Sequence, residues 1–140
     1  MHRLPDWEAR LAAYLEPLRS RPFAWGRHDC CTFAAGAVEA MTGVDPMPEF
    51  RGRYSTPRGS VRALRKFGAG DLAETLSAKF EGVAAPLAQR GDIVMSSGLL
   101  GVNLGPFLVA VGSEGEREGL IRIERAAWAD PRAWRVQFGA

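Results

Sequence analysis

The chain has 140 residues, of which 46% are hydrophobic and 24% are charged, and its formal net charge is +2. This length and composition are typical of one soluble globular domain spanning 1–140 and exclude an intrinsically disordered chain, while the small net charge indicates no class of partner. No run of eighteen apolar residues is present, so we expect no membrane span, and the N-terminal residues MHRLPDWEAR lack the apolar core of a secretion signal.

The first half of the chain has the apolar spacing of helices. Asp6 and Asp29 each stand where a helix N-cap is expected, and Gly43 stands where a left-handed residue ends a helix. Residues 44–58 contain three prolines, which predict an irregular segment. Helices are therefore expected over residues 6–16, 30–42, 60–67 and 71–80.

The second half consists of short apolar runs that are separated by glycine, proline or charged turns, a pattern typical of strands. These runs are residues 92–96, 99–104, 107–112, 120–124 and 133–138. Because the helices come first and the strands follow, the sequence predicts an α+β domain with an antiparallel sheet.

The two cysteines of the chain, Cys30 and Cys31, are adjacent. Adjacent cysteines cannot join distant loops, which favours synthesis in a reducing cytoplasm. Cys30 falls in the first turn of a predicted helix, where the helix dipole and unpaired N–H groups favour a nucleophilic thiolate. Cys31 points about 100° away around the helix, so only one of the two faces a given cleft. The alternative is that both are small buried hydrophobic residues, as free cysteines usually are.

A thiolate nucleophile needs a base, and the chain contains only two histidines, His2 and His28. His28 reaches Cys30 only if its loop folds back, and the alternative is a loop residue that bonds a backbone carbonyl. A zinc site made from residues 28–31 is disfavoured, because four consecutive residues cannot easily surround a tetrahedral ion. We therefore expect no metal and no cofactor.

Residues 51–66 hold six basic residues and no acidic residue. Such a segment is able to bind phosphate or an acidic protein surface, and the alternative, which we prefer, is a solvated face of helix and loop. Aromatic residues are sparse there, with only Tyr54 and Phe67 nearby, so no nucleic-acid partner is expected.

Four short segments together resemble a known family, the NlpC-type papain-like cell-wall peptidases, and more closely its short relatives in tailed phages and gene transfer agents. They are a W-G-x-H-D-C turn, an RGRY-like segment, a GD strand start and a C-terminal AWRV, found here at 25–30, 51–54, 91–92 and 133–136. The resemblance implies a papain-like α+β fold, in which N-terminal helices pack on a C-terminal antiparallel sheet or partial barrel.

Carried over position by position, the resemblance makes Cys30 the nucleophile and Asp29 the residue that caps its helix. Active members have a histidine on the strand after GD, in an H-x-G-I-x-x-G pattern, whereas this chain has LLGVNLG over 99–105. Leucine therefore takes the position of the histidine, and the third polar residue of the family falls in 108–111, which is entirely apolar. The expected cleft residues are Trp25, Gly26, Leu99 and Gly101.

Leucine cannot accept a proton, and loss of a general base typically costs at least about 10²-fold in rate. We therefore expect a degenerate peptidase domain, made in the bacterial host cytoplasm, that sits at the tail tip or hub of a phage-like particle and binds other tail proteins. The alternative is a working cysteine endopeptidase that cuts peptidoglycan crosslinks during DNA delivery, with Cys30 as nucleophile and His28 or a partner's histidine as base. A metal-binding or nucleic-acid-binding module is the third hypothesis.

Overall fold

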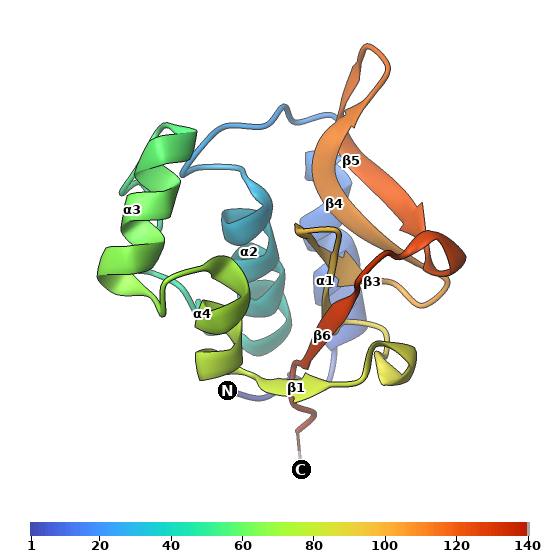
Figure 1. Cartoon of the computed structure of the whole chain (residues 1–140). Helices are drawn as coiled ribbons and strands as arrows, with labels where there is room; N and C mark the ends of the chain where they lie inside the picture. Colours follow the sequence, from blue (N-terminus) through green and yellow to red (C-terminus); the bar gives the residue numbers. More distant parts are fainter. Residues whose placement is uncertain (140) are drawn as a thin grey trace.

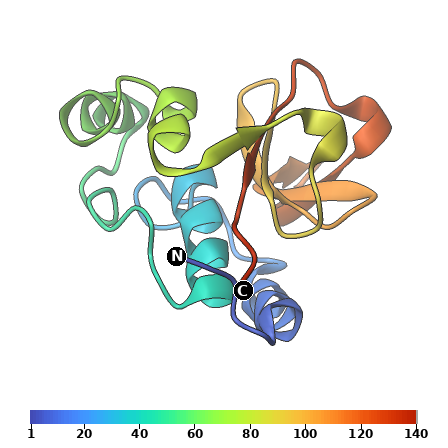
Figure 2. The ribbon, with the colours of Figure 1, turned by 90° about the horizontal axis from the view of Figure 1, so that it is seen from below.

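The computed structural model describes residues 1–139 and contains helices and a sheet that lie side by side (Figure 1). The helices are α1 (Trp7–Leu15), η1 (Glu16–Leu18), α2 (Cys30–Thr42), α3 (Pro57–Phe67), α4 (Leu72–Lys79), η2 (Ala85–Leu87) and η3 (Arg125–Ala127). Helix α2 runs through the middle, with α3 and α4 on one side and the sheet on the other (Figures 1 and 2). Within this described part of the chain, no helix is long and apolar enough to cross a membrane.

The sheet has six strands in the order β1-β6-β2-β3-β4-β5, and every neighbouring pair is antiparallel. The strands are β1 (Glu81–Val83), β2 (Ile93–Ser96), β3 (Leu99–Asn103), β4 (Phe107–Glu114), β5 (Arg117–Glu124) and β6 (Arg132–Arg135). The predicted α+β class with an antiparallel sheet is thereby confirmed. Strand β1 was not predicted, because three residues that include a glycine carry no alternating apolar pattern.

Helix boundaries follow the capping residues. Helix α2 spans the predicted residues 30–42, between the N-cap Asp29 and Gly43 in the left-handed conformation. Helix α3 begins at Pro57, three residues before the expected start, because the Thr56 side chain accepts the Gly59 N–H at 2.9 Å and proline suits the first helical turn. The expected cap by the Asp6 side chain is wrong, since its carboxylate accepts a hydrogen bond from the Arg10 side chain instead.

Helix α2 is buried along most of its length because its residues are almost all apolar or small, from Phe33 and Met41 to a run of alanines. At Gly36 an added Cβ would lie 2.2 Å from the Tyr14 hydroxyl oxygen, so glycine allows the Tyr14 ring of α1 to lie directly against α2. On the opposite side of α2, Leu100 and Val102 of β3 belong to the main core. Leu99 packs in a second apolar cluster, because alternate residues of a strand face opposite sides of the sheet.

A buried arginine joins the two ends of the described chain. The Arg3 backbone N–H donates to the Gln137 carbonyl at 2.8 Å, and the Arg3 guanidinium lies between the rings of Trp7 and Phe138. That guanidinium also donates to the Asp92 carboxylate at 2.8 Å, and the side chains of both residues are almost completely buried. The aromatic rings and the carboxylate together replace the water that the cation loses.

Asp92 is the acidic residue of the GD segment, and its carboxylate is surrounded by donors. Besides Arg3, it accepts the backbone N–H groups of Gln89 and Val136 and the Arg135 guanidinium, at 2.8, 3.1 and 2.9 Å. These partners come from both termini and from the loop before β2, so Asp92 fastens β2 and the chain after β6 to the N-terminal segment.

Candidate functional site

The turn before α2 is shaped by one glycine. Gly26 has φ +76°, and a Cβ there would lie 2.0 Å from the Tyr54 carbonyl oxygen, so no other residue fits without a shift of the backbone. The Gly26 carbonyl accepts the Gly52 N–H at 2.9 Å. The W-G-x-H-D-C turn and the RGRY-like segment therefore pack directly against each other, backbone to backbone.

Asp29 holds this turn together through four hydrogen bonds. One carboxylate oxygen accepts the backbone N–H of Thr32 at 2.8 Å and its hydroxyl at 3.1 Å. The other accepts the Gly26 N–H at 2.8 Å and the Tyr54 hydroxyl at 2.6 Å. A carboxylate offers about four acceptor positions, so Asp29 has none left for a proton transfer. It acts as a structural cap and links two distant segments.

Cys30 is the first residue of α2 and is only partly exposed. Burial, followed by the negative charge of Asp29, raises the pKa of the Cys30 thiol to about 11. The backbone N–H groups of Leu100, Cys31 and Cys30 itself lower that pKa, but by less. The N–H groups of the helix start favour the thiolate, as expected, but burial and the adjacent Asp29 carboxylate have the larger effect on the pKa of Cys30.

Cys31 points into the core, where it is buried and its sulfur contacts the sulfur of Met47 at 3.7 Å. Burial is the largest effect that raises the pKa of its thiol, and Asp29 adds to it. Cys31 therefore behaves as a small apolar residue, in keeping with the hydrophobic alternative for one of the two cysteines.

His28 does not contact the cysteine through any hydrogen bond among residues 1–139. Its side chain is 2% exposed and meets the Phe33 ring edge to face, with the ring centroids 6.2 Å apart. Its Nε2 atom is buried and has no hydrogen-bond partner in the described structure. Burial, and then the nearby Arg21 cation, lower the pKa of His28. The ring lines a pocket between α1 and α2, away from the pocket beside Cys30.

The pocket beside the Cys30 thiol has a volume of only about 60 Å³. Pockets that bind small molecules typically have volumes of about 300–1,000 Å³. Tyr54 and Asp29 form its polar part, and Leu64 of α3 and Leu72 of α4 close it from the outer side. Its full lining is Trp25, Asp29, Cys30, Cys31, Phe50, Tyr54, Ser60, Leu64 and Leu72.

Of the expected cleft residues, Trp25 lies in this pocket, and Gly26 shapes the turn beside it. Leu99 and Gly101 do not line it. The Leu99 side chain packs on the sheet face away from α2, and Gly101 lies so close to β4 that a Cβ would be 2.3 Å from the Val109 carbonyl oxygen. What β3 brings to the sulfur is the backbone N–H of Leu100.

The long-range contacts of the site were not predicted. Tyr54 was noted only as an aromatic residue near a basic segment, yet its hydroxyl contacts Asp29 across 25 positions of sequence. No local sequence pattern reveals such a pair. Within the described chain, no three His, Cys, Asp or Glu residues are grouped so that they could hold a metal ion.

A sequence model for the domain of unknown function DUF6950 matches residues 2–136. The chain belongs to the DUF6950 family. The matched range includes the whole W-G-x-H-D-C turn and both ends of the buried cluster around Asp92, from Arg3 to Val136. No curated protein matches the chain.

Proposed function

We propose that this DUF6950 chain is a papain-like domain of NlpC type that has no peptidase activity and binds other proteins at the tail tip or hub of a phage-like particle or gene transfer agent. Support for the fold comes from a cysteine at the start of a central helix that packs on an antiparallel sheet. The contact between Tyr54 and Asp29 adds to this support, because it links two segments on which the resemblance rests. The same proposal implies that the protein is located in the assembled particle.

One observation carries the non-catalytic part of this proposal: burial raises the pKa of the Cys30 thiol to about 11, and within residues 1–139 the nearest histidine in sequence, His28, makes no hydrogen bond to it. At neutral pH such a thiol is almost entirely protonated and is a poor nucleophile. The pocket beside it, at about 60 Å³, also leaves no room for a peptide substrate. A peptidase needs the opposite of each feature, namely an activated thiolate, a base and an open cleft.

The alternative is the cell-wall peptide hydrolase, and one observation favours it. The Leu100 N–H lowers the pKa of the Cys30 thiol, as a donor that stabilises a thiolate would. A base would then have to come from a rearranged His28 or from a partner chain, and α3 and α4 would have to move away from the sulfur.

The rate of thiol alkylation tests the non-catalytic proposal. In a Cys31→Ala chain, only Cys30 reacts with iodoacetamide. At about pH 7.5, a thiol of pKa about 11 has roughly 300-fold less thiolate than a free thiol of pKa about 8.5. The higher nucleophilicity of the more basic thiolate recovers about tenfold. We expect alkylation to be at least about 20-fold slower than in the urea-unfolded control; faster alkylation of the folded chain would support the hydrolase.

The location and the activity are tested together in particles from the strain that encodes the chain. We expect labelled protein at the tail tip by electron microscopy, unchanged DNA delivery by Cys30→Ala particles, and no release of peptides from purified peptidoglycan. Peptidoglycan cleavage that disappears in Cys30→Ala would establish the hydrolase. Particles that lack the protein would refute the tail location.

A further inference from the structure

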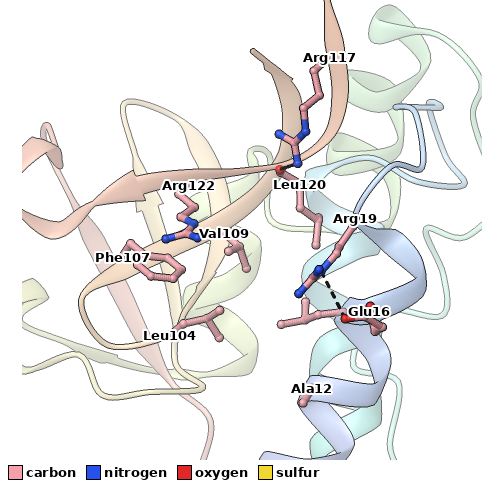
Figure 3. Close-up of a pocket in the computed structure, with 10 residues that line it drawn as sticks. Ala12, Glu16, Arg19, Leu104, Phe107, Val109, Arg117, Leu120 and Arg122 are labelled. Atoms are coloured by element: carbon pink, nitrogen blue, oxygen red, sulfur yellow. Dashed lines mark hydrogen bonds and ion pairs between the residues drawn. The ribbon is translucent and has the colours of Figure 1, made fainter.

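One of several large hollows of the described structure, all of similar volume, lies away from Cys30, between the end of α1 and the β4–β5 hairpin (Figure 3). Its volume is about 450 Å³, compared with about 60 Å³ beside the cysteine. We call it the α1–β5 groove, and it is lined by Ala12, Leu15, Glu16, Arg19, Leu104, Phe107, Val109, Arg117, Leu120 and Arg122. It is large enough to take several side chains of a partner, as the pocket at Cys30 is not.

The floor of the groove is apolar. It consists of Leu104, Phe107 and Leu120, which are only partly buried and pack at the margin of the main core, together with Val109. Leu15 of α1 forms the facing wall. A hollow whose apolar floor is still partly exposed gains free energy when another apolar side chain covers it.

The rim of the groove is positively charged. Arg19 and Arg122 stand on opposite walls, one from the end of α1 and η1 and the other from β5 (Figure 3). Glu16, the one acidic lining residue, is paired with Arg19 at 3.3 Å. Arg117 has a long pair with Glu114 at 3.7 Å. Three arginines thus face one carboxylate across the groove, which favours an acidic partner.

Arg122 has no carboxylate partner within residues 1–139; its guanidinium stacks on the Phe107 ring, with its central carbon 4.5 Å from the ring centroid. The stacking holds the cation beside the apolar floor and leaves its N–H groups available. A carboxylate that reaches Arg122 would therefore carry its neighbouring side chains directly over Phe107.

Strand β5 is also an edge of the sheet, and part of that edge is free. The Leu120 N–H points outward and donates to the Arg19 carbonyl at 3.1 Å, so the chain itself covers this part of the edge. Because N–H groups alternate in direction along an antiparallel strand, the Arg122 N–H and carbonyl point outward too. No backbone hydrogen bond outside the sheet involves Arg122 in the described chain, and such an edge is open to another strand.

We propose that the α1–β5 groove binds an extended segment of another protein that has a bulky apolar side chain flanked by acidic residues. The apolar side chain covers Phe107 and Leu120, the carboxylates pair with Arg122 and Arg19, and the segment adds as a strand to the free edge of β5 at Arg122. Addition of a strand supplies backbone hydrogen bonds, while the floor and the arginines select the side chains. This inference depends on the proposed protein-binding role, and it is independent of the tail location.

The test is a displayed library of random twelve-residue peptides, selected against the full chain. We expect enrichment of peptides with acidic residues beside a bulky apolar residue. A synthetic peptide of the enriched sequence should bind more weakly as salt is raised. In isotope-labelled protein its binding should shift the amide signals of Leu104, Phe107 and Leu120.

Charge reversal then locates the site. Arg122→Glu should weaken binding of that peptide at least about tenfold, because it puts like charges together. Arg58→Glu, an equally exposed substitution on α3 with the same change in charge, is the matched control and should bind as the unaltered chain does. Equal thermal midpoints for the two variants exclude a folding defect.

Three results would refute the groove inference. The first is enrichment of peptides without acidic residues, and the second is peptide binding that survives Arg122→Glu. The third is a concentration-dependent dimer in ultracentrifugation that Arg122→Glu abolishes, because a second copy of the chain would then be the occupant. If the chain binds an acidic peptide at the groove but is missing from particles, the tail location is refuted and the groove inference stands. If the chain is found at the tail tip but selects no peptide, the groove inference is refuted and the tail location stands.

Discussion

The carboxylate of Asp92 offers the sharpest test of what holds the fold together. Asp92→Ala leaves the Arg3 guanidinium buried between two aromatic rings with its counter-ion removed. It also removes the acceptor of two backbone N–H groups. Loss of one member of a buried pair costs about 3–5 kcal/mol of the free energy of unfolding. A domain of this size has about 5–15 kcal/mol in total, so the variant should be close to unfolding.

Urea unfolding followed by circular dichroism measures this loss, and the thermal midpoint should fall by roughly 10–20 °C. Arg3→Met together with Asp92→Ala removes both charges at once. The double variant should be more stable than the sum of the two single effects predicts, with a coupling energy of about 2–3 kcal/mol. Glu114→Ala, which removes an exposed carboxylate at the β4–β5 turn, is the control and should leave the midpoint almost unchanged.

Two results would refute this reasoning. A loss of less than about 1 kcal/mol for Asp92→Ala would mean that the buried cation finds water or another partner. Strict additivity of the two substitutions would mean that Arg3 and Asp92 act independently.

Three further predictions concern the turn before α2. Tyr54→Phe removes the 2.6 Å hydrogen bond to the buried Asp29 carboxylate and should lower the free energy of unfolding by about 1.5–3 kcal/mol in urea titrations. Gly26→Ala, which puts a Cβ against the Tyr54 carbonyl, should be at least as destabilising, and a wild-type midpoint would contradict the backbone contact. The pKa of His28 is lowered in the fold, so the unfolded chain takes up the proton first and stability should fall as pH falls through about 6.5. His28→Phe should remove that part of the pH dependence between about pH 7 and 5.

The helices and strands could be predicted because their signals are local. Asp29 and Gly43 flank an unbroken run of helix-compatible residues, and the structure ends α2 at the same two positions. The predicted capping by the Asp6 side chain was wrong because Arg10, one helical turn away, donates a hydrogen bond to the same carboxylate. A capping rule does not include this competition. Strand β1 pairs only with β6, some fifty residues later, and its three residues have no pattern of their own.

The site was less predictable because its energetics depend on residues that are distant in sequence. The N–H groups at the helix start lower the pKa of Cys30, as the rule for such a cysteine states, but the rule does not include burial beneath α3 and α4 or the charge of Asp29, which raise that pKa by more. The glycine pattern placed Leu99 at the position of a histidine, but the alternation along β3 turns its side chain to the other face of the sheet. The role of Asp92 could not be predicted either, because its partners come from the two ends of the chain.

The position of Asp92 also bears on how the protein is made. Its carboxylate is completed by donors from residue 3 and from residues 135 and 136, which leave the ribosome more than 130 residues after residue 3. Until then, the Asp92 carboxylate of the nascent chain, which is buried in the folded domain, lacks the donors Arg135 and Val136. We therefore expect the domain to become resistant to protease only after Val136 has left the ribosome, so that stalled or prematurely terminated products are degraded before they can fold.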